Sequence, residues 1–149
     1  MQAIPLERAL VAADNYPKKR LVDELVLVRR AADNGDDFIS RSDTGRLTPN
    51  IDDTAALCGY ADLIRAGYPV KLAGAIMSRI RAAMRDYPEA DQLVTVTLEN
   101  GNRFTLPADT VDLRSGYNSG GYVTFALIAD CRNLRERAQR ATEVQDAAA

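Results

Sequence analysis

The sequence of 149 residues contains no histidine and no tryptophan. Without histidine there is no Ser-His-Asp triad, no histidine general base and no histidine metal ligand. The two cysteines, Cys58 and Cys131, are too few for a zinc site of four thiolates. A nucleophilic cysteine also needs a base, the role that histidine fills in most such enzymes. We therefore expect a protein that is not an enzyme and that uses no metal or cofactor.

Long apolar runs are also missing. No stretch approaches the roughly 20 apolar residues that cross a bilayer, so we expect no contact with a membrane. The first residues, MQAIPLER, lack the basic start and apolar centre of a secretory signal. These features predict a cytoplasmic protein in which Cys58 and Cys131 are buried thiols, although a disulfide between them is the alternative. The net charge of −2 gives no bulk basicity that would indicate nucleic acid.

Apolar residues at helical spacing predict four helices before residue 88. Acidic Asp52 and Asp53 suit the first turn of the third helix, because they complement the helix dipole. The third and fourth helices, joined at Gly67, are most simply an αα-hairpin of the core, with a second helix-turn-helix as the alternative. The predicted helices cover residues 5–13, 17–32, about 50 to 66, and 69–86.

From Leu93 the apolar period changes to two, which predicts a β-hairpin. A three-residue loop over 100–102, with Asn102 in the left-handed conformation, pairs Glu99 with Arg103 and Leu98 with Phe104 and keeps the large apolar side chains on one face. Residues 122–128 are a candidate third strand. The polar stretch 35–50 is either a loop or two short strands around the turn 43–45.

A final helix over about 129–144 carries Leu134, Ala138 and Ala141 on one stripe. This stripe is a candidate oligomer interface, or it packs on the protein's own core. Four arginines of the same helix are expected to form a solvated face, and three arginines of the helix over 69–86 are expected to point away from its apolar stripe. They are Arg132, Arg135, Arg137 and Arg140, and Arg79, Arg81 and Arg85.

The elements together predict a mainly α protein with a small antiparallel β element, an α+β fold. Residues 1–88 form a helical region, and residues 89–149 add the β-hairpin and the terminal helix. The length of the chain suits one compact unit made of both regions.

The first two predicted helices have the outline of a helix-turn-helix motif. A short helix over 6–13 is followed by the turn Asp14-Asn15-Tyr16 and by a second helix that begins at Pro17. Lys18, Lys19 and Arg20 stand at the start of this second helix, where a recognition helix meets phosphates and base edges. The alternative is a solvated basic turn between two core helices.

The order of these elements resembles the mercury-resistance-type (MerR) regulators and related winged-helix proteins, over about residues 6–84. The resemblance rests on that helix-turn-helix outline, on a glycine-containing wing with an acidic helix start at 41–53 (RSDTGRLTPNIDD), and on the later turn at 63–70 (LIRAGYPV). It implies a duplex-DNA-binding transcription regulator that forms a homodimer. It places Lys18, Lys19 and Arg20 in the groove and Arg41 and Arg46 on the wing.

The alternative function is a non-enzymatic assembly or adaptor protein. It would act through protein contacts of the β-hairpin and of the C-terminal helix.

Overall fold

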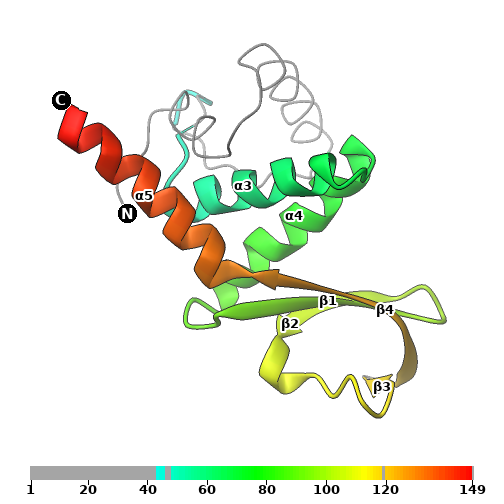
Figure 1. Cartoon of the computed structure of the whole chain (residues 1–149). Coiled ribbons are helices and arrows are strands. Elements are labelled where there is room, and N and C mark those ends of the chain that lie inside the picture. Colours follow the sequence, from blue (N-terminus) through cyan, green and yellow to red (C-terminus); the bar gives the residue numbers. More distant parts are fainter. Residues whose placement is uncertain (1–42, 46–47, 119, 149) are drawn as a thin grey trace.

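The structure is a computed structural model, and it describes residues 43–45, 48–118 and 120–148. In this part of the chain, helices lie on one side of an antiparallel sheet, which is an α+β arrangement (Figure 1). The predicted helices over 5–13 and 17–32 lie outside the described residues. So do all five candidate DNA-binding residues: Lys18, Lys19, Arg20, Arg41 and Arg46.

The predicted pair of helices in the middle of the chain is confirmed as α3 (Ile51–Arg65) and α4 (Val70–Asp86). Helix α3 begins at a capping box. The side chain of Asn50 accepts a hydrogen bond from the backbone N–H of Asp53 at 2.8 Å, and the Asp53 carboxylate accepts one from the N–H of Asn50 at 3.1 Å. The turn after α3 contains Gly67, whose φ of 97° suits glycine, and Pro69 then precedes α4.

The sheet has the strand order β2-β1-β4-β3, and every neighbouring pair is antiparallel. Its strands are β1 (Gln92–Leu98), β2 (Arg103–Pro107), β3 (Tyr117–Asn118) and β4 (Gly121–Asp130), with a 3₁₀ turn, η1 (Ala108–Thr110), after β2. The predicted third strand is therefore β4, which is longer than expected. It leads directly into the last helix, α5 (Cys131–Ala148). Helix α5 begins later than predicted because β4 stays paired with β1 as far as Asp130.

The predicted register of the hairpin is wrong by two residues. The structure pairs Thr97 with Arg103 and Val96 with Phe104, instead of Glu99 with Arg103 and Leu98 with Phe104. The loop still has three residues, but it covers 99–101 instead of 100–102, since Leu98 donates to the carbonyl of Asn102 and Gly101 donates to the carbonyl of Leu98. Gly101, with φ of 87°, takes the left-handed position that was expected for Asn102. A shift of two preserves the faces of the strands, so the apolar alternation is compatible with both registers.

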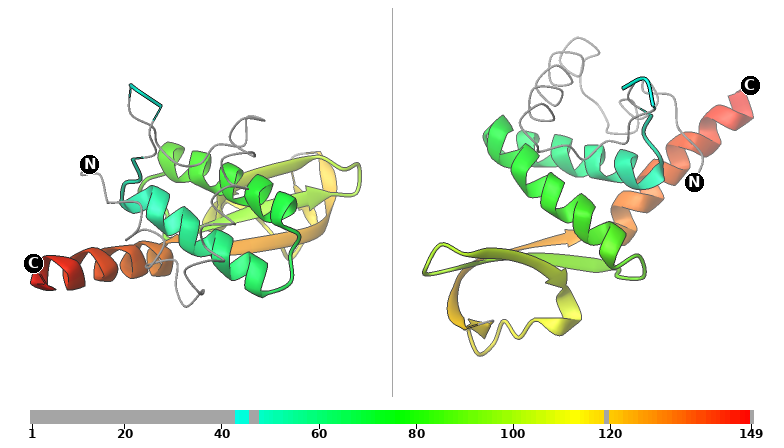
Figure 2. Two further views of the ribbon diagram at one scale, coloured as in Figure 1. Left: turned by 90° about the horizontal axis from the view of Figure 1, so that it is seen from above. Right: turned by 180° about the vertical axis from the view of Figure 1, so that it is seen from behind.

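Strand β1 lies at the centre of two apolar clusters, one on each face of the sheet. On the helical face, Leu93 is buried together with residues of α3, α4 and α5. On the opposite face, Val94, Val96 and Leu98 pack against partly buried residues of β2, β4 and the loop after η1. Figure 2 shows the helices on one side of the sheet only. Because the helical cluster draws on residues both before and after residue 88, the two regions share one core in the described part.

The stripe on α5 packs inward. Leu134 is 7% exposed and Ala138 is 0% exposed, and both belong to the core cluster beneath α3. The prediction that these two residues form an oligomer interface is therefore wrong, since their apolar surface is already covered within the chain. The side chain of Ala141 lies outside the described part of the structure. The prediction for the cysteines is confirmed: Cys58 and Cys131 are free and buried.

Candidate interaction surface

A buried ion pair fixes α4 to the start of α3. The guanidinium Nε of Arg81 lies 2.7 Å from Oδ1 of Asp53, and the two side chains are 6% and 1% exposed. Arg81, which was expected to point away from the apolar stripe of its helix, is therefore buried and not exposed to solvent. The Asp53 carboxylate accepts hydrogen bonds from both Asn50 and Arg81, which compensates for its removal from water.

Two further ion pairs tie α5 to α3. Arg135 Nε lies 3.0 Å from Asp52 Oδ1, and Arg137 Nη1 lies 2.5 Å from Asp62 Oδ2. Both arginines are largely covered, so the predicted solvated face of α5 is wrong at these two positions. It is confirmed at Arg132, which is exposed and pairs with Glu136 one turn later. The helical layer is thus held by sequence-distant charges that no helical periodicity reveals.

The outer edge of β4 is covered by another described strand over only a short part of its length. Strand β3 pairs only with the first two residues of β4, Gly121 and Tyr122. From Phe125 to Asp130, β4 pairs with β1 on its inner side, and from Thr124 to Asp130 no described strand pairs with its outer side. Phe125 is 71% exposed and Ile128 is 52% exposed on this stretch. We call Thr124–Asp130 the β4 edge.

Two hollows with mainly apolar linings open beside the β4 edge. The first, of about 390 Å³, lies between α4 and the sheet, and its lining includes Leu72, Arg79, Arg103, Phe125 and Leu127. The second, of about 410 Å³, lies between α3, β4 and α5, and its lining includes Leu63, Met77, Leu127, Ala129 and Leu134. An exposed strand edge between two such hollows has the geometry of a protein-binding surface, in which main-chain pairing is combined with side-chain pockets.

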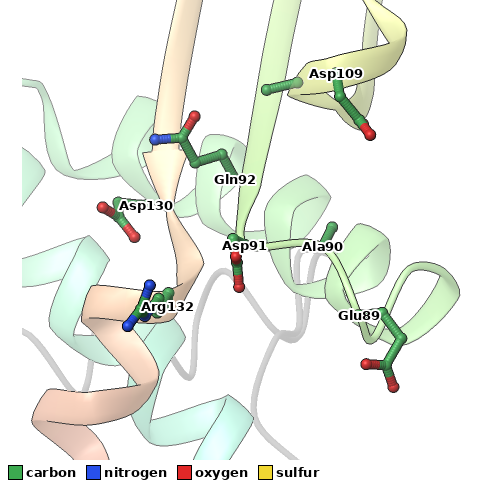
Figure 3. Close-up of a pocket in the computed structure, with 8 residues that line it drawn as sticks. Glu89, Ala90, Asp91, Gln92, Asp109, Asp130 and Arg132 are labelled. Carbon is green, nitrogen blue, oxygen red and sulfur yellow. The ribbon is translucent and has the colours of Figure 1, made fainter.

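A third hollow, of about 480 Å³, lies where β1 and α5 begin (Figure 3). Its rim is rich in carboxylates, but Figure 3 shows Glu89 and Asp109 directed away from the others. Asp130 accepts a hydrogen bond from the N–H of Asn133 at 3.0 Å and so caps α5, and the N–H of Arg132 donates to the carbonyl of Asp91 at 3.1 Å. Within the described ranges, no three His, Cys, Asp or Glu residues are placed to hold a metal ion. We interpret this hollow as a structural junction.

The thiol of Cys131 lies on the inner side of the junction between β4 and α5. Burial raises its pKa from 9.0 to about 11, more than nearby Arg135 and a hydrogen bond with the backbone of Leu93 lower it. The thiol is therefore protonated at neutral pH, which makes it a poor nucleophile. In the part of the chain that the structure describes, no helix is long and apolar enough to span a bilayer.

Comparison with known proteins gives no match: no protein-family model, no curated protein and no solved structure is similar to this chain. The function is therefore argued from the residues themselves. Reasoning from the sequence missed Phe125 and Ile128 as candidate surface residues. The signal was present in 123–129, VTFALIA, a strand segment without a charged residue. Alternation alone did not show which strand would lie at the edge of the sheet.

Proposed function

We propose that this protein is a DNA-binding transcription regulator of the helix-turn-helix type. The observation that carries the proposal is the cluster Lys18-Lys19-Arg20 at the start of a helix expected after the turn Asp14-Asn15-Tyr16. Cationic side chains at the start of a recognition helix contact phosphates and base edges. The clustering matters more than the net charge of −2, because each phosphate contact releases counterions locally.

The part of the chain after the proposed motif also supports the proposal. Asp43, Thr44 and Gly45 form an exposed turn in which Gly45 has a φ of 80°. A helix with a capped, acidic first turn follows, and the next helix begins after the turn at Gly67. This is the order that the resemblance to MerR-type regulators implies for the wing and the helices after it. In that reading Arg41 and Arg46, on either side of the turn, contact the DNA backbone.

The test is binding of the full chain to duplex DNA fragments at several salt concentrations. The variant is Lys18→Ala/Lys19→Ala/Arg20→Ala, and the control is Lys71→Ala/Arg85→Ala, which removes exposed cations from α4. We expect the variant to lose affinity and to reduce the slope of log K against log salt by up to about 3, since each phosphate contact contributes about 0.9. The control should bind like the wild type. Absence of binding by the wild type at low salt, or equal binding by the variant, would contradict the proposal.

The β4 edge favours a second candidate function, that of a non-enzymatic assembly or adaptor protein. Phe125 and Ile128 expose apolar surface between two apolar hollows, as protein-binding surfaces do. In this candidate the contacts come from β4, since the apolar stripe of α5 is covered at Leu134 and Ala138. Self-association through β4 without any DNA binding would select this candidate over the first.

A further inference from the structure

The β4 edge lacks the features that keep strand edges from pairing. Natural edge strands are short, carry charged side chains or proline, or are covered by another element. From Thr124 to Ala129 the β4 edge has no charge and no proline, and its exposed side chains include Phe125 and Ile128. Figures 1 and 2 show that β4 bends so that β3 lies below the sheet, on the side opposite the helices. Among the described residues, no strand therefore pairs with the outer side of the β4 edge.

We propose that the β4 edge pairs with the β4 edge of a second copy of this chain, antiparallel and with Leu127 on the two-fold axis. The inference goes beyond DNA binding and does not depend on it. A symmetric pair of this kind uses the same patch on both copies, so it closes on itself and cannot grow into a filament. The two four-stranded sheets then join into one continuous sheet.

The faces of the strand and the sizes of the opposed side chains select the register. A two-fold axis perpendicular to the sheet places the helical layers of both copies on the same side, so directly opposed residues must share a face. With Leu127 on the axis, Phe125 lies opposite Ala129 of the second copy. Phe125 and Leu127 line a hollow under α4, and Leu127 and Ala129 line the hollow beside α3, which puts all three on the helical face. Ala126 or Ile128 on the axis would also oppose residues of one face, but Phe125 would then meet Leu127 or Cys131 instead of the small Ala129.

The shape of the helical face fits this register. The side chain of Phe125 is 71% exposed in one copy, and the small side chain of Ala129 leaves the 410 Å³ hollow open in the other. Antiparallel pairing brings the ring of Phe125 to the mouth of this hollow, among Leu63, Met77 and Leu127. The symmetry repeats the contact, so two aromatic side chains are buried at once, which is the kind of anchor that dominates interface energy.

The first test is the mass of the full chain in solution, measured without DNA by sedimentation equilibrium from about 1 to 100 μM. We expect a dimer for the wild type. Phe125→Lys should weaken dimerisation at least tenfold, because the new ammonium would be buried in an apolar hollow. The matched control is Tyr87→Lys, which changes another exposed aromatic residue after the end of α4. A wild type that stays monomeric at 100 μM, or equal effects of the two variants, would overturn the proposal.

The second test examines the register with cysteine variants. Opposed residues of antiparallel strands have Cα atoms about 4.5–5.5 Å apart, which suits a disulfide. We expect Phe125→Cys and Ala129→Cys to form a cross-linked dimer when the two proteins are mixed and oxidised at pH 7.5, and neither to do so alone. Cross-linking of Phe125→Cys by itself, or none in the mixture, would overturn the register. Because no DNA is present in either test, failure here leaves the proposed DNA binding intact, and failure of DNA binding leaves this dimer intact.

Discussion

The two long edges of the sheet are built differently. Strand β2 has five residues, starts at the exposed Arg103 and ends at Pro107, which has no N–H to offer. Strand β4 has ten residues, and the open part of its outer edge carries no charge before Asp130. Short length, charge and proline are the ordinary means of preventing strands from pairing between molecules. The contrast indicates that the β2 edge is protected against pairing with a strand of another molecule and that the β4 edge is not.

The residues that stabilise the monomer differ from those that would bind a partner. Both edges flank β1, whose residues are buried on both faces of the sheet. If the folded monomer depends on β1 and on the helices above it, substitutions there lower stability strongly, while changes at the edges do not. Four substitutions test this division, in order of decreasing effect on stability.

The largest effect is expected from the ion pair in the helical layer. Arg81→Ala leaves the Asp53 carboxylate buried without its cation, and we expect the unfolding free energy to fall by about 3–5 kcal/mol. Chemical denaturation of both proteins at low concentration measures this loss. Arg85→Ala, which removes an exposed arginine from the same helix, should change stability by no more than about 0.5 kcal/mol. Similar losses in both variants would show that the pair does not fix the helices over the sheet.

The second-largest loss of stability is expected from a substitution in β1, which lies between the two edges. Leu93 is 0% exposed and pairs with Pro107 of β2 and Ala129 of β4. We expect Leu93→Ala to cost about 2–5 kcal/mol, from lost burial and from the cavity that remains. Leu113→Ala is the control, because Leu113 is 43% exposed on the loop that follows η1. A denaturation midpoint that shifts equally for the two leucines would contradict a monomer centred on β1.

A smaller loss of stability is expected where the protected strand β2 pairs with β1. The hydroxyl oxygens of Thr95 in β1 and Thr105 in β2 lie 2.9 Å apart, and Thr95 is 6% exposed. Thr105→Val should cost about 1 kcal/mol, because it leaves the buried hydroxyl of Thr95 without its partner. The double variant Thr95→Val/Thr105→Val should regain most of that loss. Additive losses in this double-mutant cycle would show that the two hydroxyls do not stabilise the β1–β2 pair.

The smallest effect on stability concerns the thiol of Cys131, which directly follows β4, because its titration matters only at alkaline pH. Its pKa is raised to about 11 in the folded protein, so the unfolded chain releases the thiol proton first as pH rises. The stabilising contribution is complete below about pH 9 and is lost between pH 9 and 11. We expect the stability difference between the wild type and Cys131→Ala, measured by denaturation at pH 7 to 10.5, to shrink above pH 9. A difference that stays constant over this range would indicate a thiol that titrates normally.

The local structure of the described part follows closely from its sequence. Helices α3 and α4, the acidic first turn of α3 at Asp52 and Asp53, and the strands of the hairpin are all predicted from apolar period and turn residues. These features depend on neighbours within a few positions, which is the range that periodicity and capping describe. The hairpin register was not predicted correctly, because a shift of two residues keeps every side chain on its face.

In the described part, the sequence alone therefore predicts the type and order of α3, α4, β1, β2, β4 and α5, the buried thiols of Cys58 and Cys131, and the exclusion of histidine chemistry. The tertiary structure alone decided which charges meet, as in Arg81 with Asp53 and Arg135 with Asp52. It also decided that the stripe at Leu134 turns inward and that β4 has an open edge. The physical reason is that pairing partners and edges are set by contacts between residues far apart in the chain, and the pattern within one segment carries no information about them.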